Sequence, residues 1–249
     1  FMDYSVVFAP PIERVYMSGA NLYLFSTSYE WINIDISKLT EKIKPYLPEE
    51  YKQALDKILE ITGISDELRA QMIASILQEA IRNMNAEQIK VMTSEIEKLY
   101  AEQEGFIGPL THALKISLDK LQPVSRNKYW GRLLDQFAIN EDSKGNLILA
   151  LTAEKITSIK TAYVPGGLPY IYPETTSTNR VAISDKDLNV IGSLEDLAQG
   201  EIIYSSRFIN NMLYLVTYRQ VDPLFAIDLS DPSNPRVLGY LKVPGFSEY

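Results

Sequence analysis

Alternating apolar and polar positions cover most of the chain outside one central block. In residues 1–36, and again from about residue 109 onward, short runs alternate between apolar and polar residues. Turns rich in Gly, Asn, Asp and Pro separate these runs. A period of two is typical of half-buried β-strands. The pattern therefore predicts a mainly β protein with one interruption.

The interruption, residues 37–108, has apolar residues at steps of three and four, which is typical of amphipathic helices. Three helices are predicted: one after Pro48, one capped by Ser65 and one capped by Asn85. Each has one apolar stripe. We expect the three stripes to pack against one another as a small bundle or lid.

Outside this block the short strands repeat as groups of four, each a pair of hairpins with polar turns, and the block interrupts the first group. The clearest copy runs from about Ile203 to Pro244, which is close to the length of one propeller blade, about 40 residues. Its Gly239 aligns with Gly192 of the preceding copy. The repeat therefore predicts β-propeller blades.

The predicted fold class is mainly β with an α insertion: about three four-stranded blades of a partial β-propeller plus an inserted helical bundle. Residues 1–36 and 109–249 form the blades, and residues 37–108 lie between the second and third strands of blade 1. Blade 2 covers about 129–194 and blade 3 about 195–244. Because closed propellers have about four to eight blades, we expect either a fragment or copies that cover one another's edges.

Several segments resemble the C-terminal β-propeller domain of secreted archaeal and bacterial proteins distantly related to WD repeats. The resemblance is specific over residues 129–249 and also touches the first 36 residues. The segments that carry it are Val15–Ser18, Leu133–Phe137, Gly192–Glu201, Arg219–Phe225, Ile227–Pro232 and Gly239–Ser247. It implies an exported protein located outside the cell or at its surface, and it implies no catalytic residues.

Composition removes several classes of function. Lys+Arg 24 against Asp+Glu 32 gives a net charge of -8, which opposes nucleic-acid binding. There is no cysteine, so disulfides, thiolate catalysis and thiolate metal sites are excluded. No apolar run approaches the roughly 20 residues that a membrane-spanning helix needs. We therefore expect neither nucleic acid nor a membrane span.

Candidate catalytic groups are few. His112 is the single histidine, and a nucleophile–histidine arrangement needs a serine brought from elsewhere in the chain. The pair Glu141 and Asp142 and the pair Asp185 and Asp187 are expected to be solvated turn residues. We expect no catalytic residue and lean against an enzyme.

Oxygen-rich turns near the C-terminus offer one possible cation site. Asp222, Asp228 and Asp231 lie close together in sequence, and carboxylates of this kind can hold calcium. The same residues also form ordinary turns by accepting backbone hydrogen bonds. Turn formation is the favoured interpretation, so no cofactor or metal is expected, with calcium as the alternative.

The segment 163–173 is the best candidate binding surface. It carries three tyrosines and three prolines and no charged residue. Tyrosine gives contact area at a small cost in side-chain entropy, and proline lowers the cost of ordering a loop. We predict a binding loop with Tyr163, Pro169, Tyr170 and Tyr172 in contact with the partner; packing on its own blade is the alternative.

Together these observations predict a non-catalytic extracytoplasmic module that binds protein or glycan at a cell surface through loops and the helical insertion. Two alternatives remain open. One is a self-assembling surface component whose blade edges pair between copies. The other is a hydrolase with its site at the propeller mouth and the helices as a lid.

Overall fold

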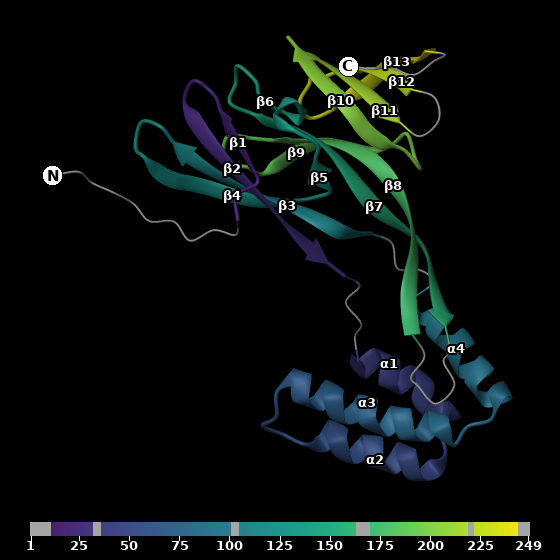
Figure 1. The fold of residues 1–249 in the computed structure, drawn as a ribbon. Coiled ribbons are helices and arrows are strands. Elements are labelled where there is room, and N and C mark those ends of the chain that lie inside the picture. The colour runs from purple at the N-terminus through teal and green to yellow at the C-terminus, as the bar shows by residue number, and fades with distance from the viewer. Residues whose placement is uncertain (1–10, 32–35, 101–104, 163–169, 219–221, 244–249) are drawn as a thin grey trace. The chain divides into compact units, whose positions relative to one another are not determined.

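The computed structural model describes residues 11–31, 36–100, 105–162, 170–218 and 222–243. The chain divides into two compact units, described separately below. We call them the sheet unit (Phe1–Trp31, Phe106–Lys155 and Thr176–Tyr249) and the helical unit (Ile32–Gly105 and Ile156–Thr175). Strands β7 (Leu147–Ala162) and β8 (Tyr170–Ser184) contribute residues to both units (Figure 1).

The first strand group of the sheet unit is an antiparallel meander. It contains β1 (Arg14–Met17), β2 (Asn21–Glu30), β3 (Phe106–Ser117) and β4 (Gln122–Trp130), paired in that order. The alternation seen in the sequence places Tyr23 and Phe25 of β2 in the core. The four helices lie between β2 and β3 along the chain.

The second group pairs around the two long strands. It contains β6 (Ile139–Glu141), β7, β8 and β9 (Val190–Leu197), and the short β5 (Arg132–Leu133) also pairs with β7. The start of β3 pairs with β7 as well, at Phe106 and Ile107. Hydrogen bonding thus joins the first two groups into one nine-stranded sheet.

The third group forms a separate four-stranded sheet. It contains β10 (Ile202–Ile209), β11 (Met212–Tyr218), β12 (Asp222–Asp228) and β13 (Arg236–Val243), in sequence order. Among the described strands both sheets are open. All three groups contribute to one hydrophobic core, which contains Tyr23, Leu149, Ile183 and Leu213. The prediction of a mainly β protein with a helical segment is therefore confirmed.

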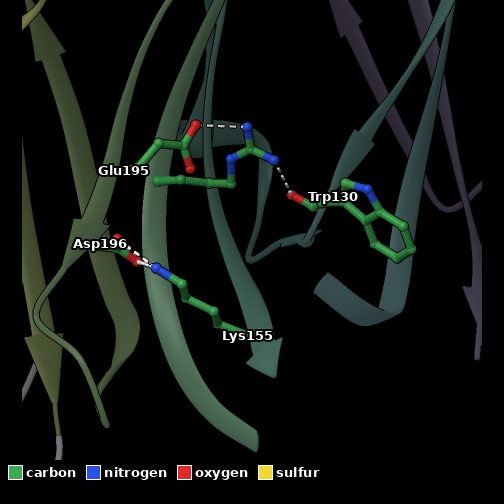
Figure 2. A network of polar contacts seen from close by, with 5 residues as sticks. Trp130, Lys155, Glu195 and Asp196 are labelled. Atoms are coloured by element: carbon green, nitrogen blue, oxygen red, sulfur yellow. Dashed lines mark hydrogen bonds and ion pairs between the residues drawn. The ribbon is translucent and has the colours of Figure 1, made fainter. Parts of the chain in front are cut away.

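Polar contacts tie the strands of the sheet unit together (Figure 2). Arg180 of β8 forms an ion pair with Glu195 of β9, with 2.7 Å between Nη2 and Oε1, and its Nη1 donates to the Trp130 carbonyl of β4 at 3.4 Å. Lys155 of β7 pairs with Asp196 at 2.7 Å. These contacts link β4 to β8, and both β7 and β8 to β9.

The helical unit contains α1 (Ile36–Ile43), a short 3-10 turn (Lys44–Tyr46), α2 (Glu49–Glu60), α3 (Asp66–Arg82) and α4 (Ala86–Tyr100). The sequence predicted three helices, and α1 was missed, because its 8 residues are too few to establish a helical period. No helix among the described residues is long and apolar enough to cross a membrane.

The predicted helix caps are confirmed. Ser65 Oγ accepts a hydrogen bond from the Leu68 amide at 3.2 Å. Asn85 Oδ1 accepts from the Gln88 amide, and Gln88 Oε1 accepts from the Asn85 amide, both at 2.9 Å. This reciprocal pair is a capping box, which satisfies two amides at the start of α4.

The ends of β7 and β8 join the helical unit, which the range 37–108 does not include. Ile159 of β7 is buried in the same cluster as Leu55 and Met92. The amide and hydroxyl of Thr161 both donate to Glu97 of α4 at 2.9 Å. Strand β7 has 16 residues, so its second half is available to pack against helices (Figure 1).

Candidate functional site

A groove of about 410 Å³ lies in the sheet unit where the first strands of the three groups approach one another. Strands β1 and β10, together with β6 and the short 3-10 turn Gln136–Ala138 before it, form its walls. Apolar and aromatic side chains dominate the lining, with a few polar groups. The lining residues are Val15, Tyr16, Met17, Gln136, Phe137, Ile139, Asn140, Arg207 and Phe208.

Arg207 is the charged residue of this groove. Its guanidinium carbon lies 3.9 Å from the centre of the Phe137 ring, so the ring supports the cation by a cation–π contact. Its Nη1 donates to the carbonyl oxygen of Ser206 at 2.7 Å. Within the described residues no carboxylate forms an ion pair with Arg207, which leaves donors free to bind a ligand.

A partly buried polar cluster beside the groove fixes one of its walls. The Glu141 carboxylate accepts hydrogen bonds from Ser18 Oγ at 3.0 Å, Asn21 Nδ2 at 3.1 Å and Tyr23 Oη at 2.5 Å. The Glu141 amide donates to Tyr16 Oη at 3.1 Å. Burial, followed by the bond to Glu141, raises the pKa of Tyr23 far above its usual value, so this phenol remains a donor.

Glu141 therefore connects the first and second strand groups by hydrogen bonds. The prediction that it is a solvated turn residue is wrong. The donors that bind it lie about 120 residues earlier in the chain, so no local pattern could reveal them. Asp142 and Asp185, in contrast, are turn formers as predicted. Asp142 accepts from the Lys144 and Asn146 amides, and Asp185 from the Asp187 and Asn189 amides.

The predicted binding segment is described only from Tyr170 onward; Tyr163 and Pro169 lie outside the described residues. Tyr170 and Tyr172 belong to β8 rather than to a loop, which corrects the expectation for this end of the segment. Residues two apart on a strand share a face, and these two rings stack at 5.8 Å with 19° between their planes. Tyr170 is 65% exposed and Tyr172 is half-buried.

The chain is similar to known proteins of one family. The model of the β-propeller domain matches residues 2–249. The chain belongs to the β-propeller family. The chain is 32% identical over 240 residues to an uncharacterised protein of Methanocaldococcus jannaschii, covering 94% of this chain and 36% of the relative. It is 29% identical over 251 residues to an uncharacterised protein of Archaeoglobus fulgidus, covering 94% and 35%.

This propeller chain thus spans about a third of the length of both relatives. No solved structure matches it. Family membership accounts for the repeated antiparallel groups.

The structure brings His112 of this propeller chain together with a serine. Ser28 Oγ and His112 Nε2 lie 2.7 Å apart, across the β2–β3 pairing. Burial, followed by the positive charge of Lys128, lowers the pKa of His112, so the ring is neutral near pH 7. No carboxylate among the described residues is hydrogen-bonded to His112, so the orienting acid of a triad is missing there.

Of the three aspartates considered for calcium, Asp228 and Asp231 accept hydrogen bonds in turns, and Asp222 is the first residue of strand β12. Hydrogen bonds from the side chain and the amide of Ser230, followed by the ion pair with Arg236 at 3.0 Å, lower the pKa of Asp228 to about 2. Asp231 accepts from the amide and hydroxyl of Ser233. Among the described residues no three His, Asp or Glu side chains are grouped to hold a metal ion.

Proposed function

We propose that this chain is a non-catalytic, extracytoplasmic β-propeller module that binds a protein or a glycan. Its blades are β1–β4, β6–β9 and β10–β13, with the helical bundle inserted between the second and third strands of the first blade. The recurrence of one antiparallel strand order in all three groups supports this division. The division accounts for all the long strands of the described chain.

The stacked pair of Tyr170 and Tyr172 carries the functional proposal. A 65% exposed tyrosine supported by a second ring offers a rigid apolar face with a polar hydroxyl. Because the pair is already stacked on a strand, little side-chain entropy is lost when a partner covers it. Such a face suits the apolar face of a sugar ring or a side chain of a protein surface.

The experiment is a screen of the purified chain on arrays of defined oligosaccharides and peptides. The double variant Tyr170→Ala, Tyr172→Ala should lose the signals that the unchanged chain gives, with an unchanged melting temperature. Tyr29→Ala is the matched control, because Tyr29 is 64% exposed and lies on β2 of the sheet unit. Signals that survive in the double variant would contradict the tyrosine pair as the site.

The contact between Ser28 and His112 favours hydrolysis as a second candidate function. A serine within 2.7 Å of a neutral imidazole can lose its proton to that ring when it attacks an ester. The test is hydrolysis of p-nitrophenyl esters by the unchanged chain and by Ser28→Ala and His112→Ala. Loss of turnover in both variants would establish an enzyme. Equal rates in all three proteins would contradict hydrolysis by Ser28 and His112.

Self-association is supported by the outer strand of the third group. Strand β13 pairs only with β12 among the described strands, and Leu238, Tyr240 and Leu241 on it are 58%, 64% and 62% exposed. An open apolar strand edge is a template for pairing with another chain. Light scattering over a range of concentrations separates this alternative: a rising mass would favour it and a constant monomer mass would contradict it.

A further inference from the structure

The groove of the sheet unit is bordered by strands that each have one unpaired edge. Among the described strands, β1 pairs only with β2, β6 only with β7, and β10 only with β11. An unpaired edge presents a row of backbone N–H and C=O groups, which an extended peptide can pair with as an added strand. A sugar has no comparable row of alternating donors and acceptors.

The register of β1 shows which backbone groups are free. The Ser18 amide donates to the Asn21 carbonyl at 2.9 Å, so Ser18 belongs to a hydrogen-bonded pair of the β1–β2 hairpin. Because such pairs alternate along an antiparallel ladder, Val15 and Met17 direct their N–H and C=O groups away from β2. Both line the groove, and their side chains are 51% and 67% exposed.

Arg207 adds a charge to this edge. Phe137 supports the guanidinium plane, one of its five donors is bonded to the Ser206 carbonyl, and no described carboxylate neutralises it. A planar guanidinium binds a carboxylate through two parallel hydrogen bonds. A guanidinium without a carboxylate partner favours an acidic ligand.

From these observations we propose that the groove binds an extended peptide and that an acidic side chain of the peptide pairs with Arg207. The peptide backbone runs along the edge of β1, and its apolar side chains contact Met17 and Phe208. The volume of about 410 Å³ falls in the range of about 300–1,000 Å³ found for ligand pockets. This site is separate from the tyrosine pair and extends the proposed function.

Fluorescence anisotropy with two labelled peptides tests the proposal. The probes are Val-Glu-Val-Glu-Val-Glu and its neutral match Val-Gln-Val-Gln-Val-Gln, both with blocked ends, so that the side-chain charge is the only difference. The acidic peptide should bind about tenfold more tightly, as expected for a charge-assisted pair. Arg207→Gln should remove that preference, and Arg207→Lys should restore part of it, because lysine keeps the charge but not the planar fork.

Arg126→Gln is the matched control: Arg126 is an exposed arginine on β4 outside the groove, and its loss should leave the preference unchanged. Equal binding of the two peptides, no binding of either, or an unaltered preference in Arg207→Gln would overturn the proposal. Preferential binding of a uronate oligosaccharide at Arg207 would also overturn it in favour of a glycan. The Tyr170→Ala, Tyr172→Ala protein should bind the acidic peptide normally, which keeps this test independent of the tyrosine proposal.

Discussion

Each of the two units has its own apolar core, and they differ in the polar contacts that join distant parts of the chain within each unit. In the sheet unit, buried and partly buried hydrogen bonds connect strands far apart in sequence: Tyr23 donates to Glu141, and the hydroxyls of Tyr129 and Ser184 lie 2.7 Å apart. In the helical unit, the core is a set of apolar stripes that includes Leu55 and Met92. A buried polar pair accepts few alternative partners, whereas an apolar stripe tolerates many.

In the sheet unit, contacts between strand groups determine which groups pack against one another. Because the strand groups resemble one another, hydrogen bonds and close contacts between particular residues must decide which groups pack together. The turn before β9 provides one such contact, because Asn127 of β4 donates to the carbonyl of Leu188 at 2.6 Å. The turn before β13 provides another, where Pro232 approaches Gly192 of β9. The second and third groups thus each place their last turn on the final strand of the group before.

The largest loss of stability is expected from a substitution at Gly192. A Cβ built there would lie 2.1 Å from the Pro232 carbonyl oxygen, so Gly192→Ala must displace backbone at the contact between two strand groups. We expect a loss of about 3 kcal/mol in the free energy of unfolding, measured by urea denaturation. Gly239→Ala is the control, since the aligned glycine has no atom within 4 Å of its added Cβ. Equal losses in the two variants would contradict the turn contact.

A smaller loss is expected at Glu141. Glu141→Gln replaces a carboxylate acceptor with an amide that cannot accept from Ser18, Asn21 and Tyr23 together. The expected cost is about 2 kcal/mol, because the buried Tyr23 and the partly buried Ser18 and Asn21 then share a single amide oxygen as acceptor. Asp119→Asn, at an exposed turn, should cost almost nothing in the same denaturation series. An unchanged free energy of unfolding in Glu141→Gln would show that apolar packing alone decides how the groups pair.

The smallest effect is expected in the helical unit. Asn85→Ala removes the side-chain acceptor of the Gln88 amide at the start of α4, leaves the backbone amide that donates to Gln88 Oε1, and should cost about 1 kcal/mol. Asn85→Asp keeps an acceptor for the Gln88 amide and should cost less. Hydrogen exchange followed by mass spectrometry should place the loss of protection in α4 and not in β1–β4. Loss of protection in the strands would contradict separate cores.

Features with a local cause could be predicted from the sequence. The strands, the three longer helices and the caps at Ser65 and Asn85 follow from periodicity and from neighbouring residues. The groove could not be predicted, because Val15, Phe137 and Arg207 come together only when three strand groups pack. The same holds for the serine beside His112, which lies 84 residues away in sequence. Tertiary packing decides such neighbours, and one sequence carries no local signal of them.

The most direct test of the binding proposal is a calorimetric titration with the strongest array ligand. Three proteins are compared: the unchanged chain, the double alanine variant at Tyr170 and Tyr172, and the double phenylalanine variant, which keeps both rings. Stacked aromatic faces predict that phenylalanine retains most of the affinity and that alanine lowers it at least about tenfold. Equal affinities in all three proteins would contradict the claim that this module binds its partner through the tyrosine pair.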